Sequence, residues 1–86
     1  MTRIISGSAR GRTLKVPTAG TRPTSDRVRE SIFNSLQHRL GTWQNLRVLD
    51  LFAGSGAFAF ESLSRGAAHA TAVDKAATAI DIIKTN

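Results

Sequence analysis

The stretch 49–61, LDLFAGSGAFAFE, contains the residue types that most directly indicate a chemical role. Asp50 lies near the end of an apolar run, and Gly54 and Gly56 follow it. With Ala59, the glycines satisfy the G-x-G-x-x-G/A pattern that joins a strand to a helix in dinucleotide-binding folds. The pattern alone is a weak indication, because glycines also serve tight turns that bind nothing.

Asp50 distinguishes between possible ligands. A pyrophosphate at a helix N-terminus needs positive potential, and a carboxylate roughly 5 Å away would repel each unit of negative charge by about 3 kcal/mol at an effective dielectric near ~20. The acid suits a ligand with a cationic end, such as the methionyl ammonium of S-adenosylmethionine. Asp74, at the end of the next predicted strand, can accept hydrogen bonds from ribose hydroxyls. We therefore expect these two acids to hold the two ends of one nucleoside.

Each of these residues also has a purely structural interpretation. Asp50 could cap the turn that follows it, and Asp74 could be the N-cap of the last helix. Gly54 and Gly56 could serve only the geometry between strand and helix. The competing enzyme class is a nicotinamide-dependent oxidoreductase, which Asp50 disfavours.

The elements predicted around these residues are the opening of a parallel α/β sheet. From residue 47 the order is a strand (47–52), the glycine turn, a helix (about 56–65), a strand (70–74) and a helix (76–85). The first strand is a nearly continuous apolar run, which is typical of a strand buried on both faces. The residues assigned to core packing in the first of these helices are Phe58, Phe60 and Leu63. The apolar stripe of the last helix consists of Ala76, Ala79, Ile80 and Ile83.

The front of the chain has a different organisation. Two β-like runs, 3–7 and 12–16, predict a basic hairpin with a glycine-containing loop, and an ordered loop or linker follows at 17–23. A helix is expected from an N-cap at Thr24 or Ser25 to Gly41. Trp43, in the next connection, is interpreted as a packing residue rather than a platform for a base. The apolar residues on one face of the helix are Val28, Ile32, Phe33, Leu36 and Leu40. The predicted parts are thus 1–23, 24–46 and 47–86.

Charge divides the chain into a basic front and a near-neutral back. Up to residue 47 there are nine basic residues against two acidic ones, and from residue 48 there are three against four, for a net charge of +6. A basic front of this kind indicates contact with a polyanion, and we expect it to bind RNA phosphates. Surface arginines are often only solvated, so Arg27 or Arg29 could instead pair with Asp26 or Glu30. The predicted RNA-binding residues are Arg3, Arg10, Arg12, Lys15, Arg22, Arg27 and Arg29.

Composition narrows the class of protein further. The 86 residues include no cysteine, and His38 and His69 stand alone, so neither a disulfide nor a metal site is expected. No apolar run reaches the roughly 18 residues of a membrane span, and we expect a cytoplasmic protein without a membrane partner. The Arg- and Ser-rich start also resembles an organellar transit peptide, but its apolar residues are placed for strands.

Three phrases in order, RIISGSARGRTL, TRPTSDRVRESIFNSL and VLDLFAGSGAFAFESLSRGA, resemble the N-terminal half of the RsmD family. That family methylates the exocyclic N2 of a guanine in 16S ribosomal RNA. The resemblance implies a Rossmann-like fold, S-adenosylmethionine as cofactor, and ribosomal RNA or a small ribosomal subunit particle as partner. It implies that the hairpin and residues 22–29 lie towards RNA. The cofactor-binding residues it implies are Asp50, Phe52, Ala53, Gly54, Ser55, Gly56, Asp74 and Lys75.

In that family the chemistry belongs to a later motif, Asn or Asp followed by Pro-Pro and an aromatic residue. The prolines here are Pro17 and Pro23, which are not adjacent, so no catalytic residue is assigned. Two strands with their helices also leave sheet edges unpaired and apolar helix faces uncovered. We therefore expect the front part of a domain of roughly 180 residues, unable to transfer a methyl group by itself. The alternative function is a stand-alone RNA-binding module in which the glycine turn is only structural.

Overall fold

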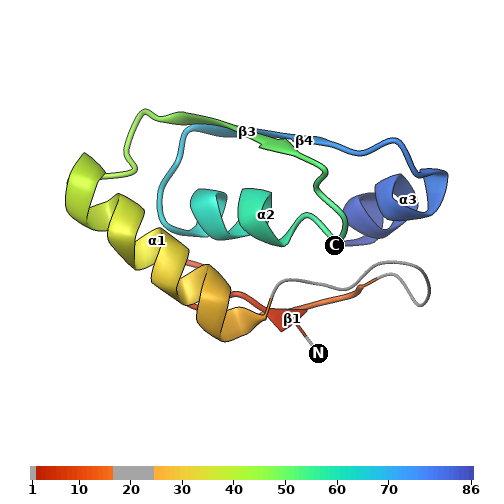
Figure 1. Ribbon diagram of the computed structural model, residues 1–86, viewed down its shortest axis with the longest axis horizontal. Coiled ribbons are helices and arrows are strands. Elements are labelled where there is room, and N and C mark those ends of the chain that lie inside the picture. The colour runs from red at the N-terminus through yellow and green to blue at the C-terminus, as the bar shows by residue number, and fades with distance from the viewer. Residues whose placement is uncertain (1, 17–24) are drawn as a thin grey trace.

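The computed structural model describes residues 2–16 and 25–86, so the predicted loop at 17–23, with Arg22, lies outside the described residues. Figure 1 shows α2 between the β3–β4 sheet on one side and the N-terminal hairpin with α1 on the other. Within the described ranges no helix is long and apolar enough to cross a membrane. The elements are β1 (Thr2–Arg3), β2 (Thr13–Leu14), α1 (Asp26–Leu40), β3 (Arg47–Leu51), α2 (Ala57–Ser64), β4 (His69–Val73) and α3 (Ala77–Thr85).

The parallel pair β3–β4 confirms the predicted order of strand, turn, helix, strand and helix. The register runs from Arg47 opposite His69 to Leu51 opposite Val73. Helix α2 covers one face of the pair, as Figure 1 shows. The prediction of a strand buried on both faces is wrong for the described chain, because burial alternates along β3 and Leu49 and Leu51 are exposed. Each strand thus has one face that no described element covers.

The antiparallel hairpin is confirmed, although its strands are shorter than predicted. Only Thr2 and Arg3 pair with Leu14 and Thr13 as a ladder. The chain from residue 5 to residue 9 leaves the ladder because its backbone N–H groups bind side chains and carbonyls of α2 instead of the opposite strand. The local sequence predicts a strand there, and a tertiary contact overrides it.

Helix α1 begins and ends as the sequence predicts. The Ser25 hydroxyl accepts a hydrogen bond from the Val28 backbone N–H at 3.2 Å, which satisfies one of the free donors of the first turn. Gly41 ends the helix with φ 78°, a conformation that glycine adopts without a steric penalty. Of the predicted apolar stripe, Phe33 is buried. The other members of the stripe are exposed in the described chain; they are Val28, Ile32, Leu36 and Leu40.

An aromatic cluster joins α1, the connection after it and α2. The ring centroid of Phe33 lies 5.3 Å from that of Trp43 and 5.8 Å from that of Phe58. The guanidinium carbon of Arg65 lies 5.0 Å from the centroid of the Phe33 ring. The packing role predicted for Trp43 is confirmed by its burial. The assignment of Leu63 to the core is wrong for the described chain, since this residue is 40% exposed.

Phe33 should carry much of the stability of this cluster. Phe33→Ala is expected to lower the free energy of unfolding by about 3–5 kcal/mol, because it leaves a cavity between two aromatic rings. Leu36→Ala, on the exposed stripe of the same helix, should cost about 1 kcal/mol. Urea unfolding of the two variants measures both values, and equal losses would contradict the assignment of Phe33 as the packing centre of α1.

Candidate functional site

The turn between β3 and α2 has an unusual backbone. Phe52, Gly54 and Gly56 all have positive φ, at 60°, 58° and 85°. The Ala53 N–H donates to the Val73 carbonyl at 2.9 Å, so the turn bends back across the end of β4. For a residue with a Cβ the left-handed conformation costs about 1–2 kcal/mol, and Phe52 adopts it while 87% of the residue is exposed. Strain of this kind, not offset by burial of the ring, is characteristic of functional turns.

The two glycines of the pattern serve different purposes. A Cβ on Gly56 would lie 2.9 Å from the Phe60 ring and 3.2 Å from Ile83 Cγ1, so these side chains would have to move, and the φ of 85° also favours glycine. The Gly56 N–H donates to the Ala53 carbonyl at 2.9 Å. The Gly54 N–H instead donates to Asp74 Oδ2 at 2.9 Å. At Gly56 the structural interpretation suffices, whereas Gly54 connects the turn to a candidate ligand-binding acid.

Asp50 lies at the carboxyl end of β3, beside the start of α2. Burial raises the pKa of its carboxyl group, the nearby Ala59 backbone N–H opposes the rise, and the negative charge of Asp74 adds to it. Ala59 is in the first turn of α2, where backbone N–H groups have no partner within the helix. Asp50 Oδ2 is buried and has no hydrogen-bond partner among the described residues. One oxygen of Asp50 therefore lies in the interior without a hydrogen bond from the described residues.

Asp74 follows β4 and is already tied into the turn. Its Oδ1 accepts a hydrogen bond from the Ala76 N–H at 2.9 Å, while Oδ2 accepts the one from Gly54. These backbone donors, Ala76 first and then Gly54, hold the pKa of Asp74 below its ordinary value. The N-cap of α3 is Ala76, so the alternative assignment of Asp74 to that position is wrong. A carboxylate has about four acceptor sites, which leaves Asp74 able to accept further bonds.

Together these contacts give the turn a negative rather than a positive character. The register places Asp50 opposite Ala72, so the two acids lie at the same edge of the sheet. The N–H groups of Ala53, Gly54 and Gly56 are already occupied by protein acceptors. An anion bound here would meet two carboxylates and few free donors. The site suits a ligand that offers positive charge and hydrogen-bond donors.

The remaining residues of the predicted cofactor set frame this turn. Lys75 is exposed beside Asp74, and Ser55 is buried. The Ser55 carbonyl accepts a hydrogen bond from Asn86 Nδ2 at 3.1 Å. Asn86 also pairs with the backbone of Lys15, accepting its N–H at 2.8 Å and donating to its carbonyl at 2.9 Å. The second side of the hairpin is thus linked through Asn86 to the turn.

Most of the predicted RNA-binding residues lie at the surface of the hairpin and α1. Arg3, Arg10 and Arg27 line a cavity of about 380 Å³ together with Asp26 and Glu30. A second cavity of about 410 Å³, on the side of the hairpin towards α2 and α3, includes Arg12 and Lys15 in its lining. The described members with exposed side chains are Arg3, Arg10, Arg12, Lys15 and Arg27.

Arg29 lies in the interior, away from the surface expected of a phosphate contact. Its side chain is 1% exposed, and Nη2 lies 3.0 Å from Asp26 Oδ1 and donates to the Arg3 carbonyl. The alternative pairing with Asp26 is confirmed. Arg29 Nε also lies 3.8 Å from Oε1 of Glu61, a residue that the sequence-based reasoning did not single out. The sequence feature that could have identified Glu61 is its position as the lone acid in an otherwise uncharged helix, AFAFESLS.

No group of His, Cys, Asp or Glu within residues 2–16 and 25–86 could hold a metal ion.

The comparison with family models gives a match, described as conserved hypothetical protein 95, over residues 2–86. The chain belongs to this family, the RsmD family. The structure of this RsmD-family chain superposes on a hypothetical protein of Thermus thermophilus with a TM-score of 0.88 and 41% identity, over 100% of this chain and 48% of that one.

Other relatives of this RsmD-family chain carry methyltransferase names. It is 49% identical over 85 residues to the putative rRNA methyltransferase YlbH of Bacillus subtilis. The aligned residues make up 98% of this chain and 45% of the relative. It is 52% identical over 73 residues to ribosomal RNA small subunit methyltransferase D of Escherichia coli K12, covering 84% of this chain and 35% of that protein. The chain thus spans less than half of the length of these curated relatives, namely 35–45%.

The raised pKa of Asp50 has a consequence for stability. An acid whose pKa is higher in the folded state disfavours folding once it ionises, and this penalty disappears as the pH falls below the unfolded value of about 3.9. Asp50→Asn keeps an oxygen for the Ala59 N–H but removes the charge. We expect the variant to be more stable than the wild type at pH 7 and equally stable at low pH, measured by thermal unfolding over a pH series.

Asp74 provides the control with the opposite sign. Its lowered pKa stabilises the fold above the ordinary carboxyl pKa, and this contribution is lost as the pH falls through the folded-state value. Asp74→Asn retains one acceptor oxygen for two N–H donors, so it should be less stable than the wild type at pH 7. If both variants shifted stability in the same direction at pH 7, the opposite environments assigned to the two acids would be wrong.

Proposed function

We propose that this RsmD-family chain is the cofactor-binding and RNA-facing part of an S-adenosylmethionine-dependent methyltransferase of 16S ribosomal RNA. The methyl acceptor in this proposal is the exocyclic N2 of a guanine, presented on ribosomal RNA or on a small ribosomal subunit particle in the cytoplasm. The names of the relatives from B. subtilis and E. coli support the class of reaction and substrate. The guanine position rests on the resemblance of the three sequence phrases.

The observation that carries the cofactor assignment is the pair of carboxylates at the glycine turn. Asp50 Oδ2 is buried without a partner among the described residues, an unfavourable arrangement that a bound ammonium would relieve. Asp74 retains acceptor capacity for ribose hydroxyls beyond its two backbone bonds. Ala53, Ser55 and Gly56 would form the backbone wall of this site. Phe52 and Lys75 are the exposed members of the proposed set.

The cofactor, when bound, supplies a methyl group activated by a sulfonium. The part played by this chain is to bind and orient the cofactor at the edge of the sheet and to bring RNA to that edge. The Asn/Asp-Pro-Pro-aromatic motif, which the resemblance gives as the catalytic motif, is not contained in these 86 residues. We therefore propose that the isolated chain binds cofactor and RNA but transfers no methyl group. Methylation of RNA by the purified chain would contradict this.

The proposed RNA face comprises the exposed basic residues of the hairpin and the start of α1. Arg29 is left out of it because its guanidinium is buried against Asp26 and the backbone of Arg3. Its proposed role is structural. The proposed face comprises Arg3, Arg10, Arg12, Lys15 and Arg27, together with Arg22 from outside the described residues.

The cofactor assignment is tested by Asp50→Ala. Removal of the carboxylate is expected to weaken binding of S-adenosylmethionine about tenfold or more, since a hydrogen bond between charged groups contributes about 1.5–3 kcal/mol. Isothermal titration calorimetry measures this affinity. RNA affinity of the same variant should stay within about twofold of the wild type, because Asp50 is in β3 and not on the basic surface.

Two outcomes would contradict the cofactor assignment. Unchanged affinity for S-adenosylmethionine in Asp50→Ala would leave the acid with only its structural role at the start of α2. Binding of NADH without binding of S-adenosylmethionine would favour the oxidoreductase class instead. RNA binding without any nucleoside affinity in the wild type would favour the stand-alone RNA-binding module.

The RNA face is tested by the double variant Arg10→Ala with Arg12→Ala. Loss of two phosphate contacts should reduce the slope of log affinity against log salt by about 1.5 and weaken RNA binding about tenfold at low salt. The charge-matched control is Arg39→Ala with Arg47→Ala, which removes two exposed arginines elsewhere. Fluorescence anisotropy with a short labelled RNA hairpin measures both. Equal effects of the two double variants would mean that only net charge matters.

A further inference from the structure

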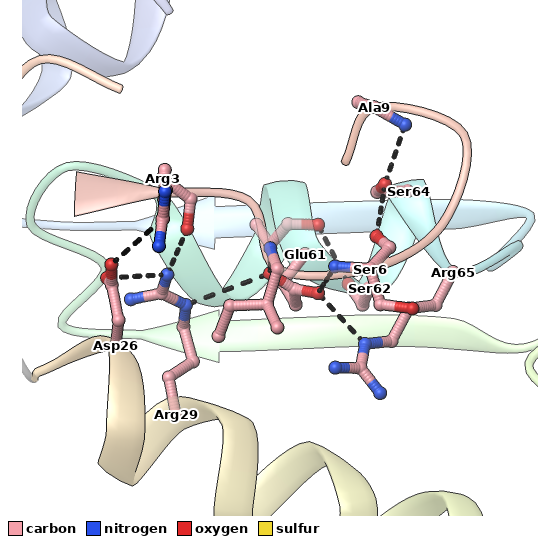
Figure 2. Close-up of polar contacts among 11 residues, drawn as sticks. Arg3, Ser6, Ala9, Asp26, Arg29, Glu61, Ser62, Ser64 and Arg65 are labelled. Atoms are coloured by element: carbon pink, nitrogen blue, oxygen red, sulfur yellow. Dashed lines mark hydrogen bonds and ion pairs between the residues drawn. The ribbon is translucent and has the colours of Figure 1, made fainter. Parts of the chain in front are cut away.

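The tip of the hairpin is fixed to α2 by a buried carboxylate. Glu61 has 0% exposure, and its Oε1 and Oε2 accept hydrogen bonds from the backbone N–H groups of Ile5 at 2.9 Å and Ser6 at 3.1 Å. Figure 2 shows the Glu61 side chain reaching from α2 to this part of the hairpin. The N–H groups of Ile5 and Ser6 bind one carboxylate, and this holds that part of the hairpin close to α2. This contact replaces the strand that the sequence predicts there.

A second set of hydrogen bonds lies one helical turn further along α2. The Ser64 hydroxyl accepts the Ala9 N–H at 2.9 Å and donates to the Ser6 carbonyl at 2.7 Å, as Figure 2 shows for Ala9 and Ser64. The Ser64 carbonyl accepts the Ser8 N–H at 2.8 Å. At Gly7, with φ +93°, a Cβ would lie 2.0 Å from the Ser64 carbonyl oxygen. The hairpin approaches α2 so closely that only glycine fits between them.

Two arginines neutralise the buried acid. Arg65 Nε lies 2.9 Å from Glu61 Oε2, and Arg29 Nε lies 3.8 Å from Oε1. Arg29 also donates to the Arg3 carbonyl, so it joins α1 and β1 to the same centre. The hairpin clamp, defined as Arg29, Glu61 and Ser64 with the backbone of residues 5–9, therefore connects α1, α2 and the hairpin. The three side chains of the clamp are almost entirely removed from solvent.

The position of the clamp on α2 relates the two parts of the proposed site. Helix α2 has eight residues, a length of about 12 Å, and the glycine turn is at its N-terminal end while Glu61 and Ser64 are in its C-terminal half. Arg10 and Arg12 lie in the hairpin one and three residues after the clamped residue Ala9. A helix this short acts as a rigid spacer. Helix α2, together with the bonds of Asn86 to Lys15 and Ser55, thus sets the distance between the exposed arginines and the cofactor turn.

We propose that Glu61 and Ser64 are positioning residues, which hold the RNA-binding hairpin at a fixed place relative to the cofactor turn. This inference rests on the proposed function, since it assigns to the clamp the orientation of RNA towards the cofactor. The clamp acts by pre-ordering residues 5–9, so that RNA binding does not carry the entropic cost of ordering them. Without it, the arginines remain but their arrangement is lost.

The chain contains matched controls for each of two variants that open the clamp. Ser64→Ala removes both hydroxyl bonds to the hairpin, and its control is Ser62→Ala, a serine buried in the same helix whose hydroxyl binds only the Ala59 carbonyl. Gly7→Ala places a Cβ against the Ser64 carbonyl. Its control is Gly11→Ala, which has a similar φ of +86° but no atom within 4 Å of the added Cβ. Comparison within each pair separates the effect of opening the clamp from the effect that the same type of substitution has elsewhere in the chain.

Three measurements are made on the purified chain: affinity for a short labelled RNA hairpin over a salt series, affinity for S-adenosylmethionine, and hydrogen exchange of the Ile5, Ser6 and Ala9 amides. Ser64→Ala and Gly7→Ala should weaken RNA binding about tenfold, lower the salt slope and speed exchange of these amides. Their affinity for S-adenosylmethionine should stay within about twofold of the wild type. Ser62→Ala and Gly11→Ala should bind RNA like the wild type.

Each contrary result has a distinct meaning. Faster amide exchange in Ser64→Ala with unchanged RNA affinity and salt slope would overturn the positioning role. A loss of RNA and cofactor affinity by the same factor would also overturn it, because the clamp would then only support the fold. Absence of RNA binding by the wild type would reject the proposed RNA function and, with it, the positioning role. Normal protection of the Ile5, Ser6 and Ala9 amides in that wild-type chain would show that misfolding was not the cause.

Discussion

The arrangement of this chain depends on one buried negative charge. Moving an unpaired carboxylate out of water costs many kcal/mol, so Glu61 is tolerable in the interior only with a full set of partners. It obtains them from three places: two amides of the hairpin, Arg29 of α1 and Arg65 at the end of its own helix. These partners therefore all lie around the Glu61 carboxylate. The acid therefore acts less as a source of net stability than as a determinant of which segments must meet.

The three sequence phrases that define the family resemblance meet at this centre. The first supplies the amides of residues 5–9, the second supplies Asp26 and Arg29, and the third contains Glu61 and Ser64. The division of charge along the chain has a related explanation. Part of the positive charge at the front is used inside the molecule, because Arg29 lies against Glu61 of the back half and Arg3 and Arg29 pair with Asp26. Asp26 and Arg29 of the second phrase thus serve the interior of the molecule.

Much of the fold follows from local patterns, and what does not follow depends on distant contacts. Ser25 and Gly41 mark the ends of α1 through the chemistry of caps, and the β3–turn–α2–β4 order follows from apolar runs and glycines. The short hairpin strands could not be predicted, because they result from Glu61, which lies far away in sequence. The sequence offered the pairing of Arg29 with Asp26, but not its burial beside Glu61 and the Arg3 carbonyl. At the turn, the pattern located Gly54 and Gly56 but could not reveal that the positive φ of Gly56 and its closeness to Phe60 and Ile83 already favour glycine there. The exposed faces of α1 and β3 show that apolar periodicity identifies a face to be covered without identifying what covers it.

The sequence separation within the clamp also determines the order in which the chain can acquire structure. Ile5 and Glu61 are 56 residues apart, and a ribosome adds about 5–20 residues per second, so the N-terminal segment precedes its anchor by roughly 3–11 s. During that interval its amides are satisfied only by water and its arginines have no fixed arrangement. Closing so long a loop also carries an entropic cost that local contacts avoid. Residues 5 and 6 consequently reach their native contacts only after a segment synthesised much later has formed.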